Sequence, residues 1–301
     1  MLNRKHKLLL FKVLSLFSVV RGYNILVITL AQYLASIYIL APDLPLREVV
    51  FDINLFLIVT ASALAIASGY IINNFYDAEK DLINKPYKSK LDRLVSQRFK
   101  LTTYFILNFL AVVAASYISF KAVLFFAAYI FGIWLYSHKL KRLPFIGNLV
   151  SATLAIAPFF VVFVYYRNFE TVIFVHALFL FLLISAREII KDLENLAGDM
   201  AQGYKTIPIL YGVKRSKVLI GLLIVLTLVP SWLLVTKFNV GYMYLYFYSS
   251  MVLLLIALLL LWKATSKKHF IWLHNLLKFI IVVGVFSILL IDINLVLNRI
   301  L

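Results

Sequence analysis

Residues 73–81 carry one amide and two carboxylates at regular spacing. Asn73, Asp77 and Asp81 lie four residues apart, so on a helix their side chains share one face. Carboxylate and carboxamide oxygens are hard ligands that suit Mg²⁺, which proteins commonly hold through one or two carboxylates together with substrate phosphates. The stretch therefore predicts part of a magnesium–phosphate site.

A second acidic stretch, residues 187–199, follows over a hundred residues later. Its acidic and amide side chains again fall on one helical face: Glu188, Asp192, Asn195 and Asp199. A single acidic cluster at a helix end is usually a solvated face that balances nearby lysines. Two clusters, each following an apolar segment on the same side of a membrane, favour one shared site for Mg²⁺ and a diphosphate.

The composition is that of a membrane protein. Of the 301 residues, 63% are hydrophobic, and the mean hydropathy is +0.96, whereas soluble globular proteins are about 45–50% apolar. We therefore expect one all-α, polytopic membrane domain over residues 1–301. The chain has no cysteine, and its five histidines show no ligand-pair spacing, which excludes disulfides, thiolate catalysis and cysteine-bound zinc.

The net charge of +17 also suits nucleic-acid binding, but the basic residues cluster in loops between apolar segments, as in membrane proteins. Most of the 30 lysines and arginines fall on the side that holds the N-terminus and both acidic stretches. We therefore expect a protein integral to the plasma membrane and no nucleic-acid partner. The N-terminus and both acidic loops would be cytoplasmic, and the C-terminus outside.

Nine segments are apolar and long enough to cross a bilayer, which takes about 20 residues. This odd number agrees with termini on opposite sides. Two long loops, after the second and sixth segments, carry the acidic stretches and are expected to form a cytoplasmic cap. The predicted spans are residues 16–40, 52–74, 101–119, 121–137, 146–166, 170–187, 216–236, 243–263 and 271–296.

Basic side chains near the acidic stretches would neutralise the phosphates of a bound diphosphate. The candidates for this role are Lys85, Arg93 and Lys191. Lys141, in the basic loop before the fifth span, is interpreted as a topology anchor. Lys278 and His274, within the last span, are expected to snorkel to the cytoplasmic edge.

A diphosphate site at the rim of an apolar interior suits a polyprenyl diphosphate, with the isoprenoid tail among the spans. Loss of diphosphate would leave an allylic cation, which aromatic faces can stabilise and from which water must be excluded. The two long loops are candidates for a lid. The tyrosines that could face the cation, although packing is the more frequent role, are Tyr70, Tyr76, Tyr129 and Tyr136.

The motifs resemble those of the UbiA superfamily of intramembrane prenyltransferases over about residues 16–296. Two matches carry the resemblance: Asn73, Asp77 and Asp81 in the first family motif, and Lys191, Asp192, Gly198 and Asp199 in the second. Segments 136–148 and 203–208 also resemble the family. The resemblance implies nine helices with a cytoplasmic active-site cap and Mg²⁺-dependent prenyl transfer. It also implies a catalytic metal–diphosphate site formed by Asn73, Asp77, Asp81, Asp192 and Asp199.

Two residues depart from the family motifs. Asn74 replaces the usual aspartate of the first motif, and Asn195 replaces an aspartate of the second. A carboxamide oxygen still coordinates Mg²⁺, but more weakly and without neutralising its charge. The departures therefore predict an altered metal affinity or ligand set.

The lipophilic acceptor is the least specified part of the reaction. Residues 187–194 look most like the branch that transfers a geranylgeranyl group to geranylgeranylglyceryl phosphate, and an anionic acceptor fits the basic loops. The element Asn84-Lys85-Pro86 is shared with branches that prenylate quinone precursors of the dihydroxynaphthoate, hydroxybenzoate or homogentisate type. A third possibility is a non-catalytic lipid transporter, but transporters place polar groups at mid-membrane on broken helices, whereas these acidic residues follow spans on one side.

Overall fold

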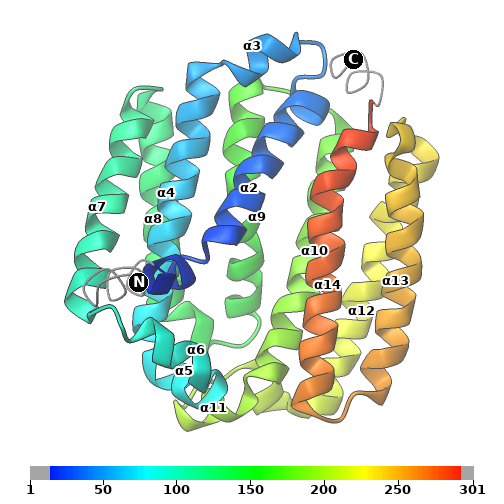
Figure 1. The fold of residues 1–301 in the computed structure, drawn as a ribbon. Coiled ribbons are helices and arrows are strands. Elements are labelled where there is room, and N and C mark those ends of the chain that lie inside the picture. The colour runs from blue at the N-terminus through cyan, green and yellow to red at the C-terminus, as the bar shows by residue number, and fades with distance from the viewer. Residues whose placement is uncertain (1–13, 293–301) are drawn as a thin grey trace, which may run out of the picture.

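A computed structural model describes residues 14–292, which form helices joined by short connections and contain no strand (Figure 1). Within this range, nine helices are long and apolar enough to cross a membrane, which confirms the expected all-α, nine-span fold. The spanning helices are α2 (Gly22–Ala35) with its π-helical continuation η1 (Ser36–Leu40), α4 (Ile53–Tyr76), α7 (Gln97–Ser116), α8 (Phe120–His138), α9 (Ile146–Tyr166), α10 (Thr171–Glu194), α12 (Ile207–Lys237), α13 (Tyr244–Lys263) and α14 (Lys267–Ser287).

Short helices cover the two ends of the bundle. Helix α3 (Leu46–Val50) lies at one end, and the cap helices lie together at the other (Figure 1). The cap helices are α5 (Ala78–Asn84), α6 (Pro86–Asp92) and α11 (Leu196–Ala201). Because α5 follows the second span and α11 follows the sixth, the two acidic stretches meet at the same end of the molecule.

Three predicted span limits are wrong for local reasons. The first spanning helix starts at Gly22 rather than at residue 16, because Arg21 adopts a left-handed conformation with φ 50° and separates this helix from the helical residues 14–19. Helix α7 starts at Gln97 because the Ser96 side chain accepts a hydrogen bond from the Phe99 amide and caps it. Helix α12 extends back to Ile207, with a non-helical Gly212 at φ 81° inside it.

The spans form two groups around an interior space. Helix α4 packs against α7 and α8, and α10 packs against α12 and α14. Alanines at four-residue spacing are fully buried on both α4 and α7: Ala61, Ala65, Ala111 and Ala115. Small residues at this spacing let helix backbones approach closely in a bilayer.

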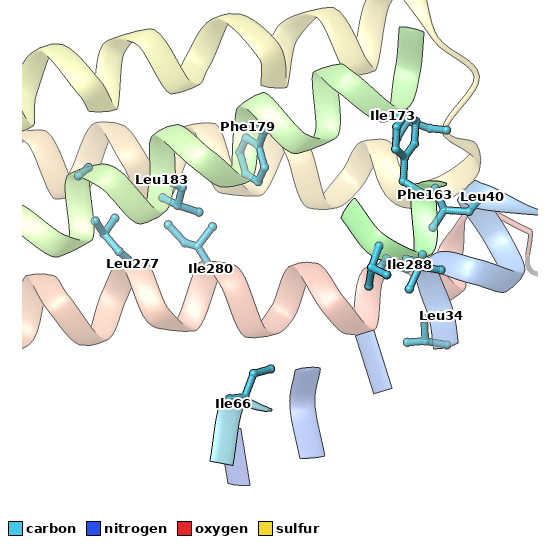
Figure 2. Close-up of a cluster of buried hydrophobic side chains, with 14 of the residues drawn as sticks. Leu34, Leu40, Ile66, Phe163, Ile173, Phe179, Leu183, Leu277, Ile280 and Ile288 are labelled. Atoms are coloured by element: carbon cyan, nitrogen blue, oxygen red, sulfur yellow. The ribbon is translucent and has the colours of Figure 1, made fainter. Parts of the chain in front are cut away.

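The C-terminal group is held by large aliphatic and aromatic side chains (Figure 2). Leu183 and Phe179 of α10 lie among buried residues that include Leu277 and Ile280 of α14. This packing fixes α10, which carries the second acidic stretch at its end.

Candidate active site

The first acidic stretch lies where α4 ends and α5 begins. Asp77 stands between the two helices with φ −92° and ψ 3°, so the chain bends there and the expected continuous helical face is interrupted. Asn73 and Asp77 line a large interior cavity. Asp81, one turn into α5, is half-buried and lies outside the lining of that cavity.

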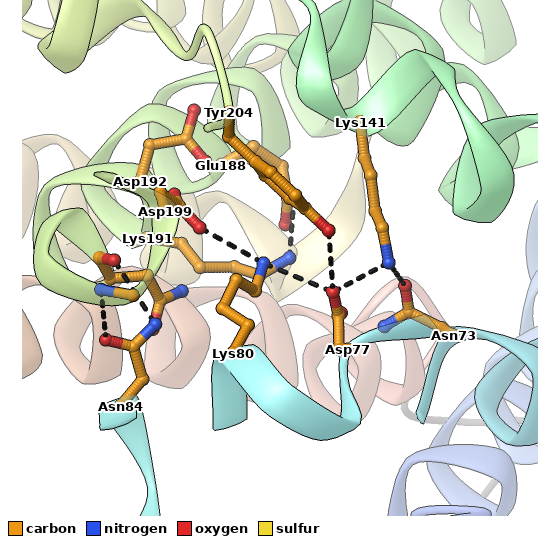
Figure 3. A network of polar contacts seen from close by, with 12 residues as sticks. Asn73, Asp77, Lys80, Asn84, Lys141, Glu188, Lys191, Asp192, Asp199 and Tyr204 are labelled. Atoms are coloured by element: carbon orange, nitrogen blue, oxygen red, sulfur yellow. Dashed lines mark hydrogen bonds and ion pairs between the residues drawn. The ribbon is translucent and has the colours of Figure 1, made fainter. Parts of the chain in front are cut away.

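Asp77 contacts three side chains of the site (Figure 3). Its Oδ1 lies 2.7 Å from Lys141 Nζ and 3.3 Å from Lys80 Nζ, and it accepts a 3.3 Å hydrogen bond from the Tyr204 hydroxyl. Lys141 Nζ also donates to Asn73 Oδ1 at 3.1 Å. Burial opposes the charge, but the two lysines outweigh it and lower the pKa of Asp77 to about 2.

Lys80 joins the two acidic stretches. Its ammonium lies 3.3 Å from Asp77 Oδ1 and 3.2 Å from Asp199 Oδ1 (Figure 3). Burial opposes the charge of Lys80, yet Asp77 and Asp199 together raise its pKa. Burial raises the pKa of Asp199, and Lys80 offsets only part of that effect. The two stretches therefore share one charged cluster.

The second stretch presents its polar side chains from the end of α10. Asn148 of α9 donates to Asp192 Oδ2 at 2.7 Å. Glu188 Oε2 accepts from Lys191 at 2.9 Å and from Ser151 at 3.0 Å. Four of these five side chains line the same cavity as Asp77, and Asn148 is the exception.

A direct clamp fixes α5 and α11 to each other. The Asn84 side chain donates to the Asn195 carbonyl at 3.2 Å and accepts from the Gly198 amide at 3.1 Å. A Cβ atom at Gly198 would lie 2.4 Å from Asn84 Nδ2, so only glycine permits this approach. The glycine of the second motif is thus explained by packing against the first.

The cavity runs from this charged cluster deep into the bundle. It has a volume of about 670 Å³ and is lined mainly by apolar and aromatic side chains. Asp192 and Ile173 of α10 both line it, which corresponds to about 28 Å along the helix axis. Of the four tyrosines considered for cation stabilisation, Tyr70, Tyr129 and Tyr136 line the cavity, and Tyr76 does not.

Two of the three predicted phosphate-binding cations lie away from the cavity. Lys191 lines it. Lys85 is half-buried outside its lining, and burial lowers the pKa of its ammonium. Arg93 is exposed after the end of α6. The cavity instead receives Lys80 and Lys141.

The interpretation of Lys141 as a topology anchor is wrong. Its side chain is buried against Asp77 because the loop after α8 turns inward, and Gly147 allows this turn: a Cβ there would lie 2.9 Å from the Leu140 carbonyl oxygen. The signal was in the sequence, since residues 136–148 resemble the family segment. Tyr204 was also missed, although it lies in segment 203–208, which resembles the family as well.

The expected snorkelling of His274 is also wrong, whereas that of Lys278 stays a prediction. His274 contacts Arg187 Nη2 at 3.0 Å and Glu194 Oε2 at 3.3 Å, so it is held between α10 and α14. Lys278 lines the cavity and donates to the Tyr23 hydroxyl at 3.1 Å.

The two departures from the family motifs have different structural positions. Asn74 accepts from the buried Lys100 at 2.9 Å and donates to Asp92 at 2.9 Å, outside the cavity lining. Asn195 lines the cavity, and its Oδ1 is buried without a hydrogen-bond partner. Only Asn195 therefore bears directly on ligand binding.

The donor set fits Mg²⁺ that is shared with a phosphate ligand. Asp77, Asp192 and Asp199, with the free oxygen of Asn195, offer hard oxygens to one space. Within residues 14–292, no three acidic or histidine side chains are gathered closely enough to hold a metal by themselves. Mg²⁺ commonly takes only one or two carboxylates and completes its coordination with substrate phosphates and water.

Comparisons with known proteins agree with these features. Residues 29–283 match the UbiA prenyltransferase family. Digeranylgeranylglyceryl phosphate synthase from Thermococcus sibiricus is 35% identical over 230 residues, which cover 74% of this chain and 79% of the relative. The enzyme of the same name from Thermococcus kodakarensis is 36% identical over 234 residues, covering 77% and 80%.

Solved structures show the same fold. A digeranylgeranylglyceryl phosphate synthase structure superposes with a TM-score of 0.68 at 22% identity, covering 92% of this chain and 97% of that one. A UbiA homologue from Archaeoglobus fulgidus, bound to GPP and Mg²⁺, superposes with a TM-score of 0.66 at 15% identity, covering 91% and 99%. The chain belongs to the UbiA prenyltransferase family.

Proposed function

We propose that the protein transfers a geranylgeranyl group from its diphosphate to the hydroxyl of a geranylgeranylglyceryl phosphate-type acceptor, with Mg²⁺ as cofactor. The carrying observation is the Asp77–Lys80–Asp199 bridge, which joins both acidic stretches at the charged end of a long apolar cavity. Relatives at 35% and 36% identity are digeranylgeranylglyceryl phosphate synthases, which favours this acceptor.

The carboxylates would hold the metal-bound diphosphate. We assign this role to Asp77, Asp192 and Asp199, with Asn73 and Asn195 as neutral ligands, while the role of Asp81 remains a prediction. Mg²⁺, when bound, would neutralise the charge that develops on the leaving diphosphate.

The lysines that line the cavity would exchange their carboxylate partners for phosphate oxygens. Lys80, Lys141 and Lys191 line the cavity, so we assign diphosphate binding to them rather than to Lys85 and Arg93. Ammonium groups held in a water-poor site stabilise developing negative charge strongly. The carbon–oxygen bond of the allylic diphosphate breaks, the acceptor oxygen forms the new ether bond, and the hydroxyl proton is released.

The apolar cavity would hold the isoprenoid tail and exclude water from the allylic cation. Its extent of about 28 Å along α10 exceeds an extended geranylgeranyl chain, which reaches about 19 Å at roughly 1.2 Å per bond. The aromatic rings of Tyr70, Tyr129 and Tyr136 face this space and are suited to an adjacent cation.

The distribution of basic residues supports an orientation with the cap in the cytoplasm. We therefore propose a single domain, integral to the plasma membrane, with the N-terminus and cap cytoplasmic and the C-terminus outside. Both groups of spans contribute to one cavity, which favours one domain.

A transfer assay tests the proposal. Membranes containing the protein would receive Mg²⁺, labelled geranylgeranyl diphosphate and either geranylgeranylglyceryl phosphate or dihydroxynaphthoate. We expect label to enter the glycerol phosphate lipid. Transfer only to the aromatic acceptor would move the protein to quinone-precursor prenylation, and absence of transfer and diphosphate release would favour a lipid transporter.

A further inference from the structure

A second polar cluster lines the same cavity and contains no acidic residue. It consists of Arg21, Tyr23 and Asn24 at the start of α2, Tyr70 of α4 and Lys278 of α14. Tyr23 is 52% exposed, so the cluster lies at an edge of the cavity between α2 and α14, which pack against each other.

The cluster is organised around two cations and two phenol rings. Lys278 Nζ donates to the Tyr23 hydroxyl at 3.1 Å and lies 4.4 Å from the centre of that ring. The Arg21 guanidinium lies 5.0 Å from the Tyr70 ring centre, and Asn24 donates to the Tyr70 hydroxyl at 3.1 Å. Each cation is thus supported by an aromatic face.

Neither cation has an acidic partner among the described residues. The ion pairs recorded within residues 14–292 include neither Arg21 nor Lys278, whereas Lys80, Lys141 and Lys191 each contact a carboxylate. Asp92 of the cap contacts Lys88 at 4.0 Å. The cluster therefore presents net positive charge to the cavity.

Lys278 occupies an unusual depth for an unpaired charge. It lies eleven residues into α14, which is about 16 Å from the start of that helix. Ionisable residues inside a membrane segment are costly, face an internal cavity and mark ligand sites. An unpaired lysine here is accounted for if an anion arrives with a ligand.

We propose that Arg21 and Lys278 bind the phosphate of the acceptor lipid. This inference rests on the proposed function, since it names the subsite for the anionic end of that acceptor. A phosphate monoester carries about −1.5 to −2 charges at pH 7, which matches two cations. The planar guanidinium suits bidentate contact with phosphate, and the Tyr23 hydroxyl offers a further donor.

The two phosphate-bearing substrates would bind to different groups of charged side chains. The donor diphosphate belongs at the acidic stretches, where four carboxylates lie: Asp77, Glu188, Asp192 and Asp199. An acceptor phosphate would be repelled there unless metal ions covered those charges, but it meets no carboxylate at Arg21 and Lys278. The cluster therefore selects a phosphorylated lipid over a neutral one.

The test compares Lys278→Gln and Arg21→Gln with Lys268→Gln, which removes an exposed lysine from the same helix. In the transfer assay, we expect each cluster variant to raise KM for geranylgeranylglyceryl phosphate roughly tenfold or more. KM for the prenyl diphosphate should stay unchanged, and Lys278→Arg should recover most of the loss. Unchanged acceptor KM in both cluster variants, with the same folding as wild type, overturns the proposal.

A binding measurement separates this proposal from the proposed function. Purified protein in neutral-lipid nanodiscs would be titrated with labelled geranylgeranylglyceryl phosphate and with its dephosphorylated form, without prenyl diphosphate or Mg²⁺. We expect wild type to prefer the phosphorylated lipid and Lys278→Gln to lose that preference, even if transfer to this acceptor fails. Equal binding of the two lipids by wild type overturns the subsite.

Anionic bilayer lipids are the other source of such a phosphate. The titration is therefore repeated in nanodiscs that contain phosphatidic acid. If phosphatidic acid at equal concentration displaces the labelled lipid fully, the cluster binds bilayer headgroups in general and the acceptor subsite is overturned. Retention of the labelled lipid supports the acceptor subsite.

Discussion

The ammonium nitrogen of Lys141 lies 2.7 Å from a carboxylate oxygen of Asp77, a residue 64 positions earlier in the chain. The pair joins the loop after α8 to the first acidic stretch. Because both side chains face the cavity, it places a cation where a diphosphate oxygen would approach the metal-binding carboxylates.

Lys141→Gln should therefore raise KM for the prenyl diphosphate and lower kcat. We expect a combined loss in kcat/KM of roughly 100-fold, because one preorganised charged donor is removed from the leaving group. Steady-state assays with varied prenyl diphosphate measure it. The neighbouring Lys139 is exposed, and Lys139→Gln should behave as wild type; equal losses in the two variants would disprove a specific role for Lys141.

Asp77→Asn should abolish turnover while the protein remains folded. The amide keeps the shape of the side chain but removes the negative charge that binds the metal, so activity should fall roughly 100-fold or more. Asp43, exposed beside α3, supplies the matched change Asp43→Asn. Wild-type turnover in Asp77→Asn would refute the metal assignment, provided that Tm shows a folded protein.

The two asparagines that depart from the family motifs should respond differently to restoration of aspartate. Asn195→Asp adds a charge to a side chain that lines the cavity, so the Mg²⁺ concentration for half-maximal activity should fall. Asn74→Asp replaces a donor 2.9 Å from Asp92 with a like charge, so it should lower Tm and leave the Mg²⁺ dependence unchanged. Magnesium titrations of both variants measure the contrast, and a shift in Asn74→Asp would contradict it.

Gly198→Ala should disturb the clamp between the cap helices. The new Cβ would lie 2.4 Å from the Asn84 side chain, so we expect a loss of about 1–3 kcal/mol in stability and a lower kcat. Gly221→Ala, whose Cβ would lie 3.3 Å from a flexible Leu258 methyl, is the milder control. If the clamp is responsible, Asn84→Ala combined with Gly198→Ala should lose no more activity than Gly198→Ala alone.

Because the chain has no cysteine, single introduced cysteines can test the orientation of the protein in the membrane. Tyr87 of α6 is 86% exposed, and Tyr117, between α7 and α8 at the opposite end of the bundle, is 76% exposed. A membrane-impermeant maleimide added to intact cells should label Tyr117→Cys, and should label Tyr87→Cys only after permeabilisation. The reverse pattern would place the cap outside.

Hydropathy predicted the number of spans because each backbone segment in a bilayer must satisfy its own hydrogen bonds, which favours long apolar helices. The helical spacing also identified Asp77, Asp192 and Asp199, which share the cavity. It did not predict the bend at Asp77, since a change in backbone direction leaves the spacing of residues unaltered.

The sequence gives weaker information about charges that serve a site from another helix. A lysine after a span looks the same whether it anchors topology or binds a ligand, so Lys141 and Lys139 were indistinguishable by type. Asn74 and Asn195 were likewise equal departures from a motif, and only the structure shows that one faces Lys100 and the other the cavity.

The Asn84 clamp has a consequence for how the protein is made. Asn84 contacts residues 111 and 114 positions later, and synthesis at roughly 5–20 residues per second separates them by about ten seconds. During that interval the third to sixth spans are translated, and the second acidic stretch is completed only at its end. The cap is therefore completed late, and a chain interrupted before α11 lacks the contacts that define its active site.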